Sequence, residues 1–266
     1  MCKSLVFDSF PFACHNRAME KDDMEKEHKD TAGNTSSRPN NLIQHTTELA
    51  MHIVSAYVHP GDVVIDATCG NGHDTLRLAE MQPSRLYAFD LQPEAIEATG
   101  CLLHEHGFTA GGPDDRIILT CLGHEHMGDY FRAHPVPAGS SGTTDVSSPA
   151  ESSGAAKTIG SSGAAASEAF AAAIVFNLGY LPGGDKAVTT CAGTTLPAVQ
   201  QALALLRTGG LLCLTMYSGH PGGSEEKRAL LAFARGLDSR QWHVSYISMP
   251  NQRKAPPEIL LISRKK

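Results

Sequence analysis

One segment constrains the fold of this chain more than any other: VVIDATCGNGHDT, at residues 63–75. Its first three residues read as a short buried strand, Asp66 stands at the end of that strand, and Gly70-Asn71-Gly72 occupy the turn before a helix. Glycines in such a turn let the backbone approach a ligand closely. A strand, a Gly-x-Gly turn and a helix in this order predict a nucleoside-binding α/β unit.

The rest of the chain continues the alternation of strand and helix. Strands separated by helices predict a mostly parallel sheet with helices on both faces, and ligands of such sheets bind at the carboxyl ends of the strands. The fourth helix is expected to open at Pro197 and to end before Thr208-Gly209-Gly210. The expected helices are 42–57, 74–81, 93–106, 197–206 and 224–237. The expected strands are 63–65, 86–89, 117–122, 171–176 and 211–216, with a final pair at 243–249 and 258–263.

Two stretches have the composition of mobile chain rather than of a folded core. Residues 1–38 are expected to form a disordered arm, because the part from 20 to 30 holds six acids and three lysines without an apolar face. Residues from about 135 to 167 are rich in Ser, Gly and Ala and are expected to form a flexible insertion. One domain over 39–266, interrupted by this insertion, is therefore expected.

Composition narrows the possible classes of protein. A formal net charge of −6 gives the chain no basic field for non-specific nucleic-acid binding, so any RNA contact must be local. The seven cysteines are scattered without a Cys-x-x-Cys pair, which predicts reduced thiols and no zinc site. No apolar run approaches the roughly 18 residues of a membrane span, and the first residues lack a signal-peptide pattern. We therefore expect a cytoplasmic protein without a membrane partner.

The next expected strand also ends in a carboxylate. Asp90 closes the segment YAFD, twenty residues after Gly70, where it can accept hydrogen bonds from two ribose hydroxyls. The strand, Gly-x-Gly turn, helix, strand and terminal aspartate thus stand in the order of a nucleoside-binding half-domain.

The residues around the turn discriminate between nucleoside cofactors. A dinucleotide fingerprint requires a small residue three positions after the second glycine, where this chain has Thr75. Asp74 would repel a pyrophosphate but suits a cationic ligand with an amino acid tail, which favours S-adenosylmethionine. Asp66 and Asp74 are expected to hold its ammonium group, directly or through water. The alternative for Asp74 is a favourable interaction with the dipole of the helix that begins there.

Several motifs together resemble one known family. They are DATCGNGHDTLRLA at 66–79, FDLQPEAI at 89–96, GHEHM at 123–127, FNLGYLPGGDK at 176–186, SGHPGGSEE at 218–226 and NQRKAPPEILLI at 251–262. In these motifs the chain resembles the rRNA methylase family, some members of which are assigned as tRNA 5-aminomethyl-2-thiouridine methyltransferases acting on the wobble uridine. The motifs span roughly residues 40–266 apart from the insertion.

The resemblance implies a Rossmann-like class I methyltransferase fold over 39–266, with a seven-stranded sheet whose last strand is antiparallel. It implies transfer of a methyl group from S-adenosylmethionine to the 5-aminomethyl nitrogen of the wobble uridine in the anticodon stem-loop of a tRNA. It also suggests a homodimer. The acidic arm and the Ser/Gly/Ala insertion depart from the family pattern without touching a motif.

Asn177 follows the fourth strand, at the edge where this fold presents the methyl acceptor. Amino methyltransferases often have Asn-Pro-Pro-Tyr in the equivalent segment, and this chain has Asn177-Leu178-Gly179-Tyr180. An amide acceptor and an aromatic face can aim the lone pair of a substrate nitrogen along the bond between methyl and sulfur. The alternative is a tight turn in which Asn177 bonds its own loop.

The reaction also needs a way to remove a proton. An aminomethyl nitrogen titrates near 10, so freeing its lone pair at pH 7 costs about 4 kcal/mol unless the site helps. Asp185 and His220 are the candidate bases, because both lie on loops that lead to the carboxyl edge of the sheet. Alternatively, Asp185 pairs with Lys186 or holds the loop, His220 stacks on the substrate ring, and desolvation alone lowers the pKa of the amine.

Two His-Glu-His strings, at 104–106 and 124–126, raise the question of a metal site. Residues two apart do not share a helix face, and neither string brings further ligands, so no metal is expected. His104 is expected on a helix surface, whereas Gly123 and His124 follow the third strand and are expected to contact the cofactor. The full set of expected cofactor contacts is Asp66, Thr68, Gly70, Asn71, Gly72, Asp74, Thr75, Asp90, Gln92, Gly123 and His124. The expected catalytic set is Asn177, Tyr180, Asp185 and His220.

A basic run near the end of the sequence is a candidate RNA contact. It comprises Arg253, Lys254, Arg264, Lys265 and Lys266. Such a patch can grip the phosphates of an anticodon stem, and the alternative is a solvated strand end.

Other functions stay open at this point. They are methylation of another RNA such as rRNA or of a small amine, a nicotinamide-dependent oxidoreductase, and a non-catalytic cofactor-binding module. Thr75 disfavours the oxidoreductase, and the presence of both Asp90 and Asn177 disfavours the non-catalytic module.

Overall fold

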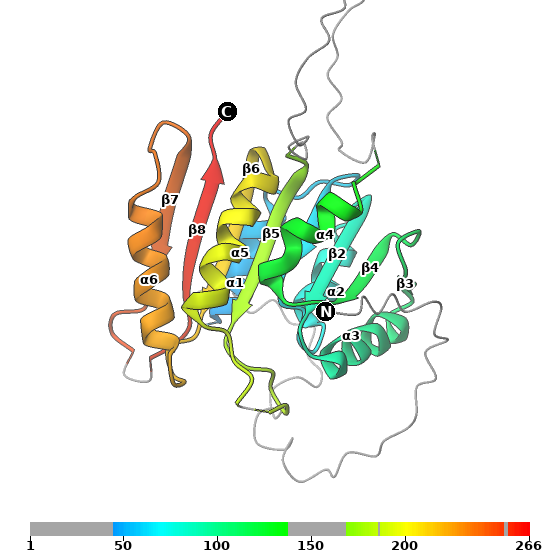
Figure 1. Cartoon of the computed structure of the whole chain (residues 1–266), viewed down its shortest axis with the longest axis horizontal. Coiled ribbons are helices and arrows are strands. Elements are labelled where there is room, and N and C mark those ends of the chain that lie inside the picture. Colours follow the sequence, from blue (N-terminus) through cyan, green and yellow to red (C-terminus); the bar gives the residue numbers. More distant parts are fainter. Residues whose placement is uncertain (1–44, 138–168, 186, 253–254) are drawn as a thin grey trace, which may run out of the picture.

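The computed structural model of the chain describes residues 45–137, 169–185, 187–252 and 255–266 (Figure 1). The expected N-terminal arm and nearly all of the expected insertion lie outside the described residues, so the expected domain boundaries stay predictions. The described residues form one mixed α/β unit with a large sheet between helices, as the sequence predicts.

The sheet has eight strands in the order β3-β4-β2-β1-β5-β6-β8-β7, and the helices lie between them along the chain. The six strands from β3 to β6 pair in parallel, and the last strand, β8, is antiparallel to both of its neighbours. The strands are β1 Val63–Asp66, β2 Arg85–Asp90, β3 Ala110–Gly111, β4 Ile117–Cys121, β5 Ala171–Leu178, β6 Leu206–Met216, β7 Trp242–Ile247 and β8 Glu258–Arg264. The helices are α1 Thr46–Ser55, α2 His73–Glu80, α3 Pro93–Glu105, α4 Met127–Ala133, α5 Ala192–Leu205 and α6 Gly223–Arg235.

The strand count differs from the expected seven. The additional strand is β3, a two-residue pairing at the outer edge beside β4, which is too short to leave a pattern in the sequence. The short helix α4 is likewise absent from the expectation. The remaining strands and their alternation with helices confirm the fold class.

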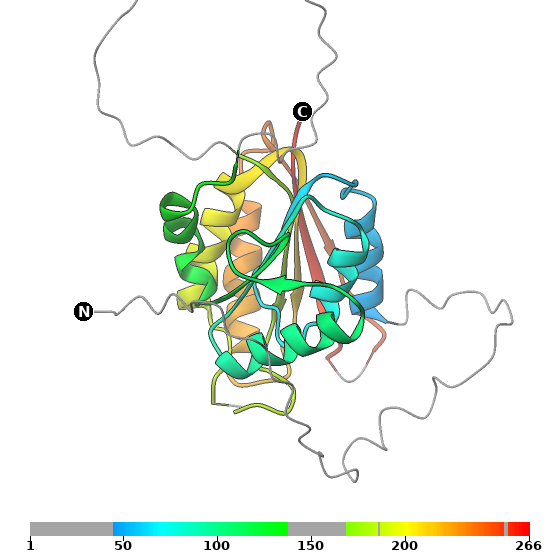
Figure 2. The ribbon, with the colours of Figure 1, turned by 90° about the vertical axis from the view of Figure 1, so that its right-hand side faces the viewer.

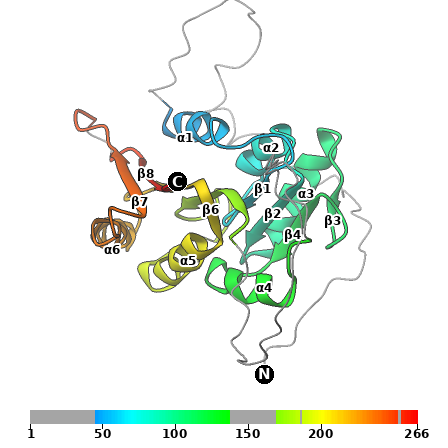
Figure 3. The same ribbon diagram turned by 90° about the horizontal axis from the view of Figure 1, so that it is seen from above.

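Helices cover both faces of the sheet, and Figures 2 and 3 show the strands between them: α1, α2 and α3 on one side, α4, α5 and α6 on the other. The central strands are buried on both faces, as parallel strands in such a sheet must be. In β5, Ile174, Phe176 and Leu178 join the core with α4, α5 and α6. Ala173 and Val175 join the core with α1, α2 and α3.

This alternation decides where the polar residues of β5 lie. Asn177 is one residue out of phase with Phe176 and Leu178, so it belongs to the face that carries α2. The chain fills one half of the sheet with β1 to β4 and then passes to the other half with β5, so the strand order reverses between β1 and β5, which are neighbours in the sheet. A doubly wound sheet binds its ligands at such a switch point, at the carboxyl ends of the strands.

The start of α5 and the segment after it correct two expectations. The helix begins at Ala192, and Pro197 lies inside it rather than at its first turn. The segment Thr208-Gly209-Gly210 does not stand between helix and strand: β6 already begins at Leu206, and its register against β5 shifts between Ala171 and Ala173, so that these residues form an irregular bulge. Gly209 takes φ of 77° there.

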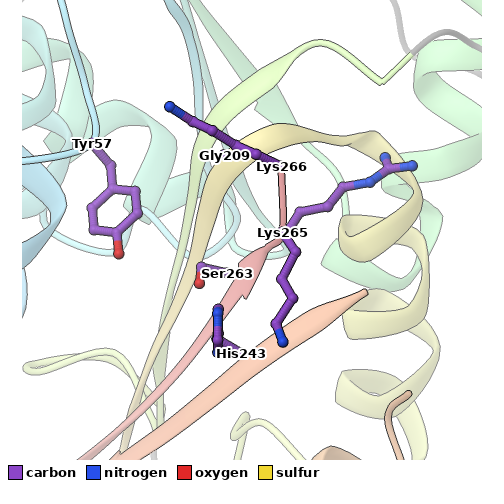
Figure 4. Close-up of a pocket in the computed structure, with 7 residues that line it drawn as sticks. Tyr57, Gly209, His243, Ser263, Lys265 and Lys266 are labelled. Atoms are coloured by element: carbon purple, nitrogen blue, oxygen red, sulfur yellow. The ribbon is translucent and has the colours of Figure 1, made fainter. Parts of the chain in front are cut away.

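The basic run near the end of the sequence is divided by a strand. Since β8 is antiparallel to β6, its last residue, Arg264, lies at the edge opposite to the carboxyl ends of the parallel strands. Figure 4 shows Lys265 and Lys266 there, beside a pocket of about 390 Å³ that is also lined by Tyr57, Gly209 and His243. Arg253 and Lys254 lie outside the described residues. A single patch of five charges is therefore not part of the described fold.

No helix within the described ranges combines the length and the hydropathy needed to cross a bilayer.

Candidate functional site

The turn after β1 brings the backbone close to the middle of α3. Gly72 takes φ of 86°, and a Cβ at this position would lie 2.8 Å from the Cα of Thr99. Gly70 takes φ of 54°, but a Cβ there would meet only Leu181, at 3.6 Å. Gly72 is thus required for packing, whereas Gly70 leaves space in front of the turn where a ligand can approach the backbone.

Asp90 holds this turn from the end of β2. One carboxylate oxygen accepts a hydrogen bond from the backbone N–H of Gly70 at 3.0 Å, and the other accepts from the N–H of Gln92 at 2.9 Å. Burial raises the pKa of Asp90, and the amide hydrogen bonds oppose that rise. A carboxylate has about four acceptor positions, so two remain for the hydroxyls of a ribose. Leu91, the next residue, is 61% exposed and offers an apolar surface beside this carboxylate.

Asp66 is the structural centre of the same turn. It is only 1% exposed, and its carboxylate accepts hydrogen bonds from the hydroxyl of Thr75 at 2.7 Å and from the N–H of Thr68 at 3.1 Å. Burial raises the pKa of Asp66 to about 7, although the bond from Thr75 works against the rise. The geometry assigns Asp66 and Thr75 to ordering the turn, and direct contact of Asp66 with a ligand stays a prediction.

Asp74, in the first turn of α2, is the more accessible of the two expected ammonium partners. Burial raises its pKa, while Arg77 and His73 lower it through their charges. Its carboxylate accepts a hydrogen bond from the side-chain amide of Asn177 at 3.3 Å. The position near the helix N-terminus also fits the dipole interaction that the sequence left open.

Asn177 links the turn after β1 to the end of β5. Its backbone N–H donates to the hydroxyl of Thr68 at 2.7 Å, and its side-chain Nδ2 donates to Asp74. Its Oδ1 is buried and has no hydrogen-bond partner among the described residues. The side chain therefore does not bond its own loop. Since buried polar atoms are almost always paired, this acceptor is available for a donor that the site receives.

The segment 179–190, called the β5 loop below, closes on itself after Asn177. The carbonyl of Gly179 accepts hydrogen bonds from the N–H of Thr190 at 2.9 Å and from the hydroxyl of Thr189 at 3.1 Å, and Tyr180 pairs with Thr189 in an isolated antiparallel bridge. On the other side, Asn71 Nδ2 donates to the carbonyl of Pro182 at 3.2 Å. The loop thus contacts the turn after β1.

Asp185 lies at the exposed tip of this loop. Its Oδ1 accepts a hydrogen bond from the N–H of Ala187 at 2.9 Å. Of the alternatives from the sequence, this contact agrees with the one in which Asp185 holds the loop. Lys186 lies outside the described residues, so pairing between these two side chains is not tested.

His220 packs against the β5 loop from the segment after β6. Its Nδ1 is 3.2 Å from the hydroxyl of Thr189 and 3.0 Å from the carbonyl of Pro221, and its ring meets Tyr180 edge to face, with centroids 6.3 Å apart. A carbonyl can only accept, so Nδ1 carries the hydrogen and Nε2 of the neutral ring carries the lone pair. Nε2 is buried against Gly223 and has no hydrogen-bond partner among the described residues.

His124 occupies a separate position, in a single 3-10 turn that Gly123 precedes. The ring is 8% exposed and meets Phe176 edge to face at 5.7 Å. Burial lowers the pKa of His124, so the neutral ring is favoured. Its Nε2 also lacks a partner among the described residues. Contact of Gly123 and His124 with a cofactor stays a prediction.

The structure brings most of the expected residues to one edge and adds others that sequence reasoning missed. Tyr217 follows β6, is 36% exposed, and lies against Gly179, where a Cβ would be 3.7 Å from Tyr217 Cβ. Its signal was its place directly after a strand. The hydroxyls of Thr189 and Thr190 left no signal, since threonine is ordinary in a loop. Glu226 was visible only as the last residue of the motif SGHPGGSEE.

Within the described ranges, no three His, Cys, Asp or Glu side chains come together as a metal site requires.

Comparison with known proteins places this geometry among methyltransferases. The family model "Putative rRNA methylase" matches residues 163–263. The chain is 34% identical over 226 residues to the chloroplastic tRNA (mnm(5)s(2)U34)-methyltransferase of Arabidopsis thaliana, an alignment that covers 82% of this chain and 69% of that protein.

Solved structures give the same result. The crystal structure of a protein from Clostridium thermocellum described as "putative rRNA-methylase" matches with a TM-score of 0.63 and 30% identity, over 83% of this chain and 97% of that one. A protein from Streptococcus mutans described as "a putative methyltransferase", solved in complex with SAH, matches with a TM-score of 0.60 and 28% identity, over 83% of this chain and 98% of that one.

Proposed function

The chain belongs to the rRNA methylase family of S-adenosylmethionine-dependent methyltransferases, and we propose that it methylates the 5-aminomethyl nitrogen of the wobble (2-thio)uridine of tRNA to give 5-methylaminomethyl. The relative from Arabidopsis thaliana bears the name of such an enzyme. One observation on this chain carries the proposal: the buried, unpartnered Oδ1 of Asn177 at the switch point of the sheet. This acceptor suits a substrate that brings an N–H group.

The residues at the turn after β1 fit the cofactor. Gly70 leaves open space beside the backbone, and Asp90 keeps two acceptor positions for ribose hydroxyls. Asp74 supplies a carboxylate for the ammonium group. When bound, S-adenosylmethionine supplies a methyl group on a positively charged sulfur, which the site needs only to orient.

Asn177 is the residue we assign to orienting the acceptor. Its Nδ2 is held by Asp74, so the amide plane is fixed and Oδ1 accepts an N–H of the substrate amine. Fixing one N–H turns the nitrogen lone pair toward the methyl group, and orientation of this kind accounts for a large part of enzymatic rate enhancement. Tyr180, 43% exposed beside this position, offers an aromatic face for the uracil ring.

The amine must lose one proton before its lone pair can form the new bond to carbon. As the bond between methyl and sulfur breaks, the positive charge would pass from sulfur to the methylated amine, so one proton has to be taken up per methyl group transferred. We propose His220, rather than Asp185, as the group that takes a proton. The lone pair of the neutral His220 ring is on Nε2, whereas Asp185 is exposed and bonded to the backbone of Ala187. The ring must turn away from Gly223 for Nε2 to reach the acceptor.

Two further parts of the proposal concern the state of the protein. We propose a homodimer, following the family, and a cytoplasmic location, following the sequence; the name of the relative from Arabidopsis thaliana places that protein in the chloroplast. Sedimentation of the purified chain and localisation of the tagged full-length protein test these two points.

Mass spectrometry of nucleosides tests the reaction itself. tRNA that carries unmethylated 5-aminomethyl wobble uridine is incubated with the protein and S-adenosylmethionine, and the expected result is a gain of one methyl group on that nucleoside. If no methyl group is gained while SAH still binds in a parallel titration, the proposed acceptor is contradicted and the proposed cofactor is not. The same assay on rRNA fragments and on small amines then decides between the other acceptors.

A further inference from the structure

Glu226 is a buried carboxylate that the proposed reaction does not use. It lies in the first turn of α6 and is 2% exposed. Within the described residues its hydrogen-bond partners are two hydroxyls: Thr190 donates to Oε2 at 2.9 Å and Thr195 donates to Oε1 at 2.5 Å. Burying a carboxylate is costly unless its acceptors are used, and these two bonds offset part of that cost.

The two hydroxyls belong to different parts of the molecule. Thr190 ends the β5 loop, and Thr195 lies in α5. Glu226 therefore joins three segments, namely α6, α5 and the end of the loop that begins two residues after Asn177.

The bond to Thr190 connects Glu226 to the part of the site proposed for the methyl acceptor, called the acceptor side below. The N–H of Thr190 donates to the carbonyl of Gly179, and the hydroxyl of the preceding Thr189 contacts both that carbonyl and Nδ1 of His220. A shift of Thr190 would therefore move both the start of the β5 loop and the ring of His220. The opposite side of the loop is held by Asn71 through Pro182.

We propose that Glu226 is a positioning residue for methyl transfer: by holding Thr190, it fixes the β5 loop, against which His220 packs, beside the acceptor, while the turn after β1 does not depend on it. The inference rests on the proposed function, since it concerns the acceptor side of that site. In this proposal Thr190 acts on the acceptor side, whereas the bond from Thr195 to Glu226 joins α5 to α6.

Four variants test this assignment. Glu226→Gln weakens both bonds, Thr190→Val and Thr195→Val each remove one hydroxyl with little change in shape, and Glu225→Gln removes a carboxylate from the neighbouring, exposed position of the same helix. For each variant we would measure kcat and KM with the RNA acceptor, the Kd of SAH, and hydrogen exchange of the peptide that contains residues 178–191.

Misplacement of a reacting group by about 1 Å can cost about 100-fold in rate, so we expect kcat to fall at least about 10-fold in Glu226→Gln and in Thr190→Val. KM for the RNA and the Kd of SAH should stay within about twofold, because the substitutions change neither the groups that contact the phosphates of the RNA nor the turn after β1. Thr195→Val and Glu225→Gln should keep kcat within about twofold. The double variant Glu226→Gln with Thr190→Val should lose no more than Glu226→Gln alone.

Two results would overturn the proposal: an equal loss of kcat in Thr195→Val and Thr190→Val, or a loss of SAH affinity that matches the loss of kcat. Hydrogen exchange decides the question without any substrate. Exchange in 178–191 should be at least about 10-fold faster in Glu226→Gln and Thr190→Val than in Glu225→Gln, and equal protection in all variants would refute the positioning role. If the unaltered protein fails to methylate the aminomethyl uridine, the proposed function fails while the exchange result still tests Glu226.

Discussion

The turn after β1 and the β5 loop meet at one edge of the sheet, but they are held in different ways. The turn is held mainly by carboxylates that accept backbone N–H groups, as Asp90 does from Gly70 and Gln92. The β5 loop is held in part by bonds between side chains, such as Thr190 to Glu226, 36 residues away in the sequence.

This difference predicts that substitutions can impair the two sides of the site separately. A change in the turn should act on the cofactor and on stability, because the turn is also part of the core against Thr99. A change at the acceptor side should act on turnover, because the β5 loop lies at the surface. The predictions below test that separation.

The largest effect is expected for Asn177→Ala. It removes the acceptor that we assign to the substrate N–H, and removal of a single orienting group costs on the order of 100- to 1,000-fold in kcat. The Kd of SAH should change less than about threefold, since the turn keeps Asp90 and Gly70. Both constants come from methyl-transfer assays and calorimetric titration. A large loss of SAH affinity would break the separation between the two sides.

Asp90→Ala should show the reverse pattern. It removes the proposed ribose acceptor and leaves the N–H of Gly70 unpaired, so SAH affinity should fall about 10- to 100-fold. Asp90→Asn is the matched control, because one carbonyl oxygen remains and the loss should be smaller. Calorimetric titration of both variants measures the effect. Unchanged affinity in Asp90→Ala would remove Asp90 from the cofactor site.

The two glycines of the turn should differ from each other. Gly72→Ala places a Cβ 2.8 Å from Thr99 Cα in a left-handed conformation, and the free energy of unfolding should fall by about 2–4 kcal/mol. Gly70→Ala meets only Leu181 at 3.6 Å, so it should cost about 1–2 kcal/mol of stability. It should nevertheless weaken SAH binding more, because its Cβ enters the space before the turn. Urea unfolding and titration of both variants check this order.

The buried Asp66 should make stability depend on pH. Burial raises its pKa from 3.8 to about 7, so the folded protein binds this proton more tightly than the unfolded chain does. Stability should therefore fall as pH rises from about 4 to about 7 and level off above that. Between pH 5 and pH 7 the decrease should be about 2 kcal/mol greater than in Asp66→Asn. If urea unfolding gives the same dependence of stability on pH for both proteins, Asp66 does not hold its proton.

The smallest effect is expected for Asp185→Ala. The side chain is exposed and bonds only the N–H of Ala187 among the described residues, so kcat should fall less than about fivefold. The pH profile of kcat should keep its shape. A loss as large as that of Asn177→Ala, together with a missing pH limb, would instead make Asp185 the base.

Much of the fold could be predicted, because short periodic segments decide it. The strands β1 and β2 end in Asp66 and Asp90, and Asn177 is the second-last residue of β5. Parallel strands place these ends at one edge. The position of the expected cofactor residues at this edge follows from the rule alone, since they lie in neighbouring units of the chain.

The errors in the fold predicted from the sequence have a common cause, which is tertiary packing. Pro197 indicated a first helical turn, but α5 starts earlier, with the hydroxyl of Thr195 bonded to Glu226 in that added turn. The glycines at 209 and 210 indicated a break, but pairing with β5 extends β6 through a bulge. Local propensity was overridden in both places by contacts with distant segments.

The acceptor side could be predicted only in part for the same reason. Asn177 and Tyr180 follow directly from the end of β5. Thr190, Tyr217 and Glu226 do not, because their significance comes from residues that approach each other only in the folded chain. No periodicity or motif spacing reveals a bond between a loop threonine and a helix glutamate.

The hydrogen bond between Asn177 and Asp74 connects the two ligands of the proposed reaction energetically. Asp74 is assigned to the ammonium group of one ligand and Asn177 to the amine of the other, so a ligand bound at Asp74 would act through this bond on the residue assigned to the second ligand. Thermodynamic linkage requires the effect to be mutual: whatever factor the cofactor adds to RNA affinity, the RNA adds to cofactor affinity. The enzyme would then bind its methyl donor most tightly when an acceptor is bound, and would release the donor more readily when no acceptor is present.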